Sequence, residues 1–274
     1  MVPGDGTLSL ASSDGRACGR HPQGRGFDPL ARHKTRGGVV EKYGFTYDPD
    51  VIPDALPAVD GRYARHELFR AFPWAVWNSS VLEGYNFTFS EVDTIINGYA
   101  VAGYPIDHIE DVRGIASGWR VALEAMDDHR PADESLMRDI NEAITRKTSL
   151  IPREFKGESD TVYGDGGRVR ALTGTYTAPP PGEIRGLFDE FSEDDVVERA
   201  FLRVPFIARL QPFWDGNKRT ALMTSSVDLV NHGYPPLVVE KKLKSEWHEG
   251  LNTLFMDGDA TAVLDVLRRS VLHV

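Results

Sequence analysis

The sequence predicts a mainly α-helical protein with one short β-hairpin. From about residue 60 onward, apolar residues recur at helical spacing between Gly and Pro breaks. The stretch between Pro152 and Pro181 differs, because β-forming residues and glycines dominate it. The chain has 274 residues, enough for a sizeable hydrophobic core. Its hydrophobic and charged fractions, 41% and 26%, are those of a soluble globular protein.

The N-terminal segment differs from the rest of the chain. Residues 1–40 are rich in Gly, carry scattered Arg and show no periodicity, so we predict a flexible tail. We expect residues 41–110 to form an N-terminal helical region and residues 111–274 to form the core domain.

The N-terminal helical region is predicted from aromatic density and capping signals. The stretch Tyr63 to Trp77 suits a helix that closes on a core. Ser90 is expected to start the next helix, with Asp93 three residues on as a capping-box-like pair. That helix is expected to run to about Ala102 and to end at Gly103.

The middle of the chain combines helices with the β element. Helices are predicted over residues 107–126 and 133–148, and a hairpin or extended flap near residues 169–177. Pro181 is a favourable first residue for a helix through Phe191. Ser192 is the expected N-cap of a helix over residues 193–210.

The C-terminal part begins with the stretch Gln211 to Thr220, which lies between two apolar runs. The helix that follows it is expected to reach about His232 and to end at Gly233. Two further helices are predicted near residues 244–256 and 260–272.

The stretch Gln211 to Thr220 has the features of an anion site. Gly216 belongs to a tight-turn signal, and apolar spacing resumes directly after it, so a loop leads into a helix N-terminus. Backbone N–H groups at such a place lack partners and can bind an anion. Lys218 and Arg219 oppose the helix dipole there, which a bound anion would explain.

Two more side chains suit a phosphate ligand at this loop. Asp215 could hold a divalent cation on the same anion, and Asn217 could hydrogen-bond a phosphate oxygen. An ordinary capped loop with surface charges is the alternative, and composition alone favours it.

The complete ten-residue string resembles the signature of the Fic (Fido) family, His-Pro-Phe-x-(Asp/Glu)-Gly-Asn-(Gly/Lys)-Arg-x-x-Arg. The matching residues are Phe213, Asp215, Gly216, Asn217, Lys218 and Arg219. Two positions differ. Gln211 stands where the family has its catalytic histidine, and Leu222 stands where it has a second arginine.

Other motifs extend the resemblance to about residues 70–240. Ser79 to Gly84 is similar to the family's inhibitory motif, (Ser/Thr)-x-x-x-Glu-(Gly/Asn), and its position resembles the subclass with an N-terminal inhibitory helix. Tyr176 to Pro180 is similar to the end of the family's β-flap, and Gly-Tyr-Pro-Pro at 233–236 is typical of the family. The resemblance implies a Fic-type helical bundle with a short β-hairpin flap.

The resemblance also implies a chemistry, which is AMP transfer from ATP to a hydroxyl group of a protein. Asp215 would hold Mg²⁺, Gln211 would occupy the base position, and Glu83 would inhibit or replace the base. The expected nucleotide ligands are Gly216, Asn217, Lys218 and Arg219. A protein target would dock on the flap near Arg168–Thr177 by strand addition.

The two departures leave three hypotheses open. Glutamine cannot act as a general base near neutral pH, and losing such a base typically costs ~10²–10⁴-fold in rate. Leu222 cannot bind a γ-phosphate or pair with Glu83. The chain is then an attenuated nucleotidyltransferase, an enzyme of different chemistry in which Glu83 transfers protons, or a catalytically inactive nucleotide-binding regulatory protein. Whether it is an enzyme at all therefore stays open.

The composition of the chain indicates its cellular location and the classes of partner it can have. No apolar run reaches the ~18 residues of a membrane span, and no secretory h-region is visible. Cys18 is the only cysteine, which suits a reducing cytoplasm. We therefore expect a cytoplasmic protein without a membrane partner. The net charge of −10 argues against a nucleic-acid partner.

Overall fold

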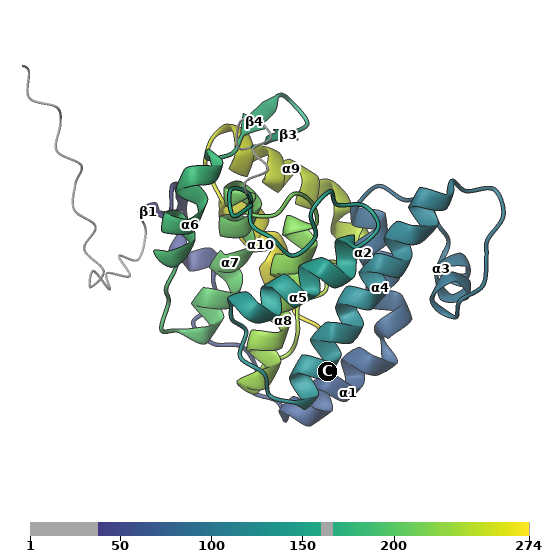
Figure 1. Cartoon of the computed structure of the whole chain (residues 1–274). Coiled ribbons are helices and arrows are strands. Elements are labelled where there is room, and N and C mark those ends of the chain that lie inside the picture. Colours follow the sequence, from purple (N-terminus) through teal and green to yellow (C-terminus); the bar gives the residue numbers. More distant parts are fainter. Residues whose placement is uncertain (1–37, 160–166, 274) are drawn as a thin grey trace, which may run out of the picture. The chain divides into compact units, whose positions relative to one another are not determined.

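The computed structural model describes residues 38–159 and 167–273. Residues 35–274 form one compact unit, and its described part is mainly helical, as predicted (Figure 1). The helices are α1 (Gly61–Arg70), α2 (Phe72–Leu82), α3 (Phe89–Ile96), α4 (Ile106–Asp127), α5 (Glu134–Thr145), α6 (Pro181–Asp189), α7 (Val196–Leu210), α8 (Asn217–Asn231), α9 (Lys244–Met256) and α10 (Thr261–Arg268). The strands are β1 (Val40–Lys42), β2 (Phe45–Tyr47), β3 (Arg168–Arg170) and β4 (Thr175–Thr177).

Helix α8 lies at the centre of the bundle, and α7, α4 and α5 pack directly against it (Figure 1). Every residue of α8 from Arg219 to Val230 is buried. A helix buried on all sides carries no polar face, and several of the polar residues here are small hydroxyl side chains. Two of these hydroxyls, those of Thr224 and Ser226, bond the backbone of their own helix. Thr224, for example, donates its hydroxyl to the carbonyl of Thr220 over 2.8 Å.

Two hydrophobic clusters hold the helices together. One joins α7, α9 and α10 with β1 and β2, and includes Phe45, Phe201, Phe206 and Trp247. The other joins α1 to α5 with α8, and includes Trp119 and Ile140. Because α8 contributes to both clusters, its N-terminus is fixed from two sides.

The flap prediction is confirmed. Strands β3 and β4 pair antiparallel, and the hairpin is anchored to two helices. The Tyr176 hydroxyl donates to the carbonyl of Arg209 over 3.0 Å, and its ring stacks on Phe255. At the turn, the backbone N–H of Thr173 donates to Asn252 Oδ1 over 2.9 Å. The flap is therefore tied to the end of α7 and to α9.

Two N-terminal helix predictions were wrong. The aromatic stretch from residue 63 to residue 77 forms α1 and α2, because Pro73 suits only the start of a helix. Helix α3 begins after Thr88, not at Ser90. Thr88 and Glu91 form the capping box, with Glu91 N–H donating to the Thr88 hydroxyl over 3.3 Å. The helix also ends at Ile96 instead of Ala102.

Two further differences concern caps and strands. Asp195, not Ser192, caps α7, and its carboxylate accepts the N–H of Glu198 over 2.9 Å. The hairpin β1–β2 was not predicted, because its turn uses Tyr43 and Gly44 at φ 53° and 76° in place of an Asn-Gly signal.

The predicted tail lies almost entirely outside the described residues. The remaining predicted helices agree with α4 to α6 and α8 to α10 to within about four residues.

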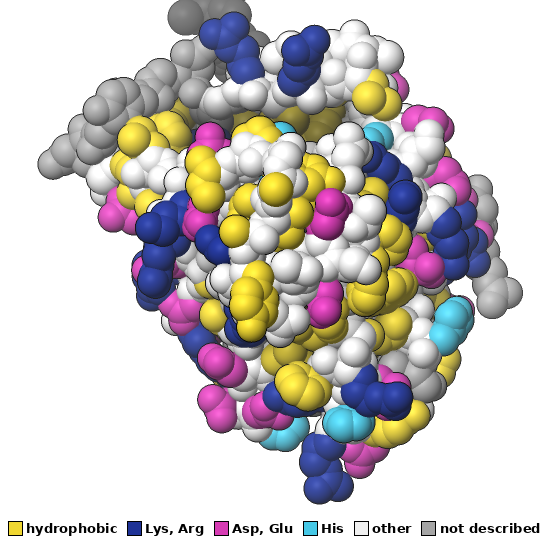
Figure 2. Space-filling view, turned by 90° about the vertical axis from the view of Figure 1, so that its right-hand side faces the viewer, with side chains coloured by type: hydrophobic (Ala, Val, Ile, Leu, Met, Phe, Trp, Pro, Cys, Tyr) yellow, Lys and Arg dark blue, Asp and Glu magenta, His cyan; other side chains and the backbone are white. Residues whose placement is uncertain are grey.

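The surface of the α3–α4 side carries both signs of charge. Figure 2 shows acidic and basic side chains interspersed with apolar ones on this face.

Among the described residues, none of the helices combines the length and the apolar character that crossing a bilayer requires.

Candidate active site

Gln211 ends α7 in a left-handed conformation, at φ 50° and ψ 49°. Its side-chain nitrogen donates to the carbonyl of Ala208 over 2.7 Å. Its side-chain oxygen accepts a hydrogen bond from Asn217 Nδ2 over 3.0 Å. Both ends of the carboxamide are therefore bound within the protein, at the position where the resemblance places a catalytic base.

Asn217 closes the loop between α7 and α8. Its Oδ1 accepts the backbone N–H of Phe213 over 2.9 Å, and its Nδ2 donates to the Phe213 carbonyl over 2.9 Å as well as to Gln211. The two N–H bonds of this amide are thus used inside the loop. Asn217 can still offer its backbone N–H to a ligand, because that group belongs to the first turn of α8.

Gly216 makes the entry into α8 possible. It has φ 75°, and a Cβ at this position would lie 2.7 Å from Thr145 Cγ2. No side chain caps α8, and the described residues supply no acceptor for the backbone N–H groups of Lys218 and Arg219. The structure thus confirms a loop that leads into a helix N-terminus with unsatisfied amides, which is a favourable place for an anion.

Asp215 is fixed at the mouth of the loop. Its Oδ1 accepts the N–H of Gly216 over 2.6 Å and a bond from Arg219 over 3.2 Å, and its Oδ2 accepts the Thr148 hydroxyl over 3.2 Å. Its side chain is nevertheless 42% exposed. A carboxylate held in this way keeps lone pairs available to a cation that arrives with a ligand.

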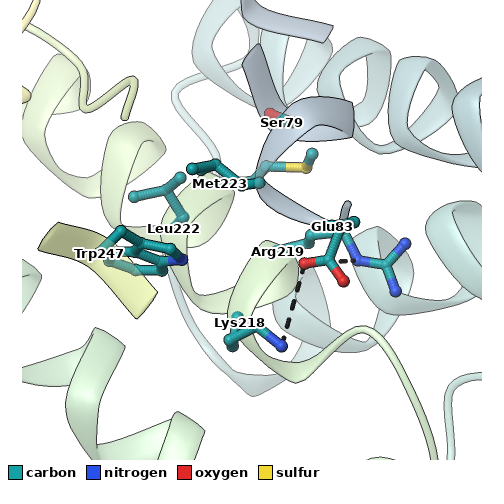
Figure 3. A pocket seen from close by; sticks show the side chains of 8 residues that line it. Ser79, Glu83, Lys218, Arg219, Leu222, Met223 and Trp247 are labelled. Carbon is teal, nitrogen blue, oxygen red and sulfur yellow. Dashed lines mark ion pairs between the residues drawn. The ribbon is translucent and has the colours of Figure 1, made fainter. Parts of the chain in front are cut away.

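Glu83 at the end of α2 faces the first turn of α8 (Figure 3). Its carboxylate lies 3.7 Å from Arg219 Nε and 4.0 Å from Lys218 Nζ. Burial raises the pKa of Glu83, but Lys218 and Arg219 outweigh burial and hold it below its ordinary value. The glutamate is therefore a stable anion at neutral pH that binds both cations of the loop.

Arg219 forms ion pairs with both Glu83 and Asp215. Burial lowers the pKa of its guanidinium, while Glu83 and Asp215 raise it above its ordinary value. The side chain is only 9% exposed, so these charges interact with little solvent between them. A phosphate that binds Arg219 has to compete with both carboxylates.

Two adjoining hollows surround these groups. The first is polar, has a volume of about 290 Å³ including its open mouth, and lies over the start of α8. It is lined by Glu83, Gln211, Trp214, Asp215, Gly216, Asn217, Lys218 and Arg219. The second is apolar and shares Glu83, Lys218 and Arg219, with Leu222 and Trp247 on its far side (Figure 3). All of the site residues expected from the sequence therefore line one pocket.

The apolar hollow shows what replaces the expected second arginine. Leu222 is buried and lies beside Trp247 from α9. Glu83 pairs with Lys218 and Arg219, which precede Leu222 by four and three residues on α8.

The sequence analysis missed several residues that hold the site. Asn141 in α5 donates to the carbonyl of Asp215 over 2.8 Å and is buried. His248 in α9 lies with Nε2 2.9 Å from the carbonyl of Leu82, next to Glu83. Asn141 could have been recognised as the polar residue on the apolar face of its helix. No comparable signal marks His248.

Lys156 supports the loop from a different segment. Its backbone N–H donates to the carbonyl of Pro212 over 2.8 Å, and its ammonium lies 6.0 Å from the centre of the Trp214 ring. Burial lowers the pKa of Lys156 to about 8. The lysine is therefore bonded to the loop between α7 and α8 but is not among the residues that line the polar hollow.

The donor set fits a magnesium ion that is carried by a nucleotide. Within residues 38–159 and 167–273, no group of three His, Cys, Asp or Glu side chains could hold a metal on its own. Mg²⁺ commonly binds through one or two carboxylates together with phosphate oxygens. Asp215, half exposed beside the helix start, is the carboxylate placed for that role.

Comparison with known proteins gives the same family as the motif. Residues 131–227 match the model of the Fic/DOC family. The chain is 25% identical over 209 residues to a protein adenylyltransferase Fic of Culex quinquefasciatus, covering 72% of this chain and 39% of the relative. It is 27% identical over 220 residues to the protein of the same name in Drosophila erecta, covering 75% of this chain and 42% of the relative. The chain thus spans about two fifths of these relatives.

Solved structures agree on the fold. Fic-1 from C. elegans aligns with a TM-score of 0.60 at 16% identity, over 77% of this chain and 67% of that one. A Fic family protein from Desulfovibrio desulfuricans aligns with a TM-score of 0.59 at 18% identity, over 84% of this chain and 75% of that one. These alignments show a Fic-type fold, and the Fic/DOC family domain itself is matched over residues 131–227, from just before α5 into α8.

Proposed function

We propose that this chain binds ATP together with Mg²⁺ in the polar hollow at the start of α8, and that it is an adenylyltransferase-type protein whose AMP transfer is attenuated. One observation carries the proposal. The hollow brings together unsatisfied helix amides, two cationic side chains and one half-exposed carboxylate around one open mouth. Phosphate groups need donors and positive charge in this arrangement.

The proposed phosphate ligands are the groups at the start of α8. The backbone N–H groups of Asn217, Lys218 and Arg219 would donate to phosphate oxygens, while Gly216 permits close approach because it has no side chain. The Asn217 side chain supports this loop from inside. The cations Lys218 and Arg219 would compensate the phosphate charge once they are released from Glu83.

Asp215 would hold Mg²⁺ on the nucleotide. The ion would neutralise phosphate charge, in the manner of other nucleotide-bound magnesium. The bonds from Gly216 and Thr148 would keep the carboxylate oriented toward the mouth of the pocket.

Gln211 is the reason for proposing attenuation. A target hydroxyl has to lose its proton when it attacks phosphorus, and a carboxamide cannot accept that proton near neutral pH. The bonds to Ala208 and Asn217 also hold this carboxamide in one orientation. Loss of a general base typically lowers the rate by ~10²–10⁴-fold.

Glu83 is better suited to inhibit than to replace the base. A carboxylate whose pKa is lowered by two cations is a weak proton acceptor. Its ion pairs with Lys218 and Arg219 compete with phosphate for the same charges. We therefore assign Glu83 the inhibitory role, and the flap near Arg168–Thr177 the docking of a protein target by strand addition.

A regulatory protein that binds nucleotide without turnover is the second candidate. The carboxamide of Gln211, which is held by two hydrogen bonds, favours this candidate. Two carboxylates also line the polar hollow, but neither is free to act as a general base. Glu83 would first have to leave its ion pair with Lys218, and Asp215 would have to leave its hydrogen bond to Gly216.

Label transfer from α-phosphate-labelled ATP tests the proposal and separates the two candidates. The natural protein, Gln211→His and Glu83→Gly are each incubated alone and with a cell lysate. Weak transfer by the natural protein that rises with Gln211→His supports an attenuated enzyme. Transfer by Gln211→His alone supports the regulatory protein on an intact scaffold. Transfer that disappears in Glu83→Gly would make Glu83 the base. The absence of transfer by every variant, together with no thermal stabilisation by ATP and Mg²⁺, would refute nucleotide binding.

A further inference from the structure

The flap presents two arginines on one exposed face. Arg168 and Arg170 are exposed and alternate with Val169, which lies toward the core. Their partners across the hairpin, Thr177 and Thr175, are exposed as well. The outer face of the flap therefore has a cationic row on β3 and a hydroxyl row on β4.

These arginines differ from most other described arginines, because they have no partner among the residues that the structure describes. Most described arginines bind a carboxylate, as Arg138 binds Glu158, and Arg209 bonds a carbonyl and lies over an aromatic ring. Within residues 38–159 and 167–273, the guanidinium groups of Arg168 and Arg170 have no carboxylate, carbonyl or aromatic partner. In a chain with a net charge of −10, this positive pair is uncommon.

Among the described residues, the backbone groups of Arg168 and Arg170 have no hydrogen-bond partner along the outer edge of β3. Ala171 N–H donates to the carbonyl of Gly174 over 2.9 Å, so these two residues form a hydrogen-bonded pair. Antiparallel register repeats such pairs at every second residue, which puts Arg168 and Arg170 in the non-bonded positions. Their N–H and C=O groups therefore point away from β4, toward the free edge.

The hairpin is bonded to the end of α7, which leads into the candidate active site. Tyr176, the cross-strand partner of Val169, donates its hydroxyl to the carbonyl of Arg209, two residues before Gln211. A strand added to β3 would therefore extend a hairpin whose other strand is bonded to the end of α7 that carries the base position.

We propose that the edge of β3 binds an extended acidic segment of the target protein, with carboxylates at positions i and i+2 that pair with Arg168 and Arg170. This inference rests on the docking role proposed above and names the chemistry of the target. Residues i and i+2 of a strand lie on one face about 6.6–6.8 Å apart, which matches the spacing of the two arginines. A protein strand fits better than a nucleic acid, because the free backbone groups that accompany the charges suit strand addition.

Peptide binding measured by fluorescence anisotropy tests the inference without requiring any nucleotide. The probes are ten-residue Val/Thr peptides with Glu at positions i and i+2, and the same peptides with Gln or Lys there. Tight binding is expected only for the Glu peptide. The double variant Arg168→Glu/Arg170→Glu should weaken it by about tenfold to thirtyfold and improve binding of the Lys peptide. N-methylation of alternate peptide amides should abolish binding, because it removes the edge hydrogen bonds and leaves the charge unchanged.

A matched control separates local pairing from net charge. Arg62→Glu/Arg70→Glu makes the same charge change on exposed positions of α1, and should leave peptide binding unaltered. Equal binding of the Glu, Gln and Lys peptides, equal weakening by the control variant, or no peptide binding at all would overturn the inference. Binding of single-stranded oligothymidine in place of the peptides would overturn it as well.

Arginines on an edge strand can also serve to prevent self-association. If that is their only role, Arg168→Thr/Arg170→Thr should form dimers or aggregates while peptide binding stays absent, which again contradicts the inference. Because every arm measures peptide binding or self-association, failure here is distinguishable from failure of nucleotide binding, which is measured by thermal stabilisation with ATP and Mg²⁺.

Discussion

The side-chain amide of Asn217 donates to the side-chain oxygen of Gln211 over 3.0 Å, which joins the first residue of α8 to the residue that ends α7. The same asparagine bonds both backbone groups of Phe213. One side chain thus determines the shape of the phosphate loop and the orientation of the group at the base position.

Asn217→Ala should therefore destabilise the protein. The change leaves the buried N–H of Phe213 without its acceptor, and an unsatisfied buried group typically costs ~1–3 kcal/mol. Urea denaturation should show a lower midpoint for Asn217→Ala. The control is Asn97→Ala, which removes an exposed amide that bonds only the carbonyl of Asp93. Equal effects of the two changes would contradict the structural role of Asn217.

Gly216→Ala should be more costly than alanine at an open glycine. Gly216 combines φ 75° with a Cβ position 2.7 Å from Thr145 Cγ2, whereas Gly98 has φ 91° and no atom within 4 Å. We expect Gly98→Ala to show only the backbone penalty of ~1 kcal/mol and Gly216→Ala to exceed it. Thr145→Ser removes the clashing methyl group, and should recover part of the loss in the Gly216→Ala background but not in the Gly98→Ala background.

The ion pairs of Glu83 should appear in the pH dependence of stability. Its pKa in the folded protein lies below the ordinary value of 4.5 because Lys218 and Arg219 favour the anion. The resulting stabilisation is fully present above the unfolded-state pKa, and is lost as the pH falls through the folded-state pKa. The free energy of unfolding of the natural protein should fall more steeply below about pH 4.5 than that of Glu83→Gln. Parallel curves in this range would show that the pairs contribute nothing.

His248→Phe should weaken inhibition without touching the pocket itself. The imidazole lies 2.9 Å from the carbonyl of Leu82, and its loss frees the end of α2 that carries Glu83. We expect tighter ATP binding in titration calorimetry, because Glu83 would compete less well for Lys218 and Arg219. If His248 acts through Glu83, the gain disappears when the change is made in a Glu83→Gln background. A gain of equal size in both backgrounds would contradict this route.

The sequence predicted the helices whose boundaries are marked by strong local chemistry. Pro181 and Gly233 set their helix boundaries as expected, because backbone geometry decides them locally. Thr88 and Asp195 were missed as caps, since several Ser, Thr or Asp residues stood within a few positions, although Thr88 with Glu91 forms a local capping box.

The same distinction applies to the candidate site. The residues of the loop could be named because they are consecutive, and the structure brings them together with Glu83 in one pocket. The partners of Glu83 could not be predicted, because they depend on how α2 lies against α8. Asn141 and His248 escaped prediction for the same reason, since each reaches the site from a helix distant in sequence.

The position of Glu83 makes two events thermodynamically inseparable. The carboxylate and a bound phosphate would share Lys218 and Arg219, so each one weakens the hold of the other. Coupling between two equilibria is reciprocal. Anything that draws the end of α2 away from α8 would raise nucleotide affinity by some factor, and nucleotide would loosen α2 by the same factor. Because His248 joins α2 to α9, saturation with nucleotide should be detectable as faster amide exchange at the end of α2, where His248 contacts the carbonyl of Leu82.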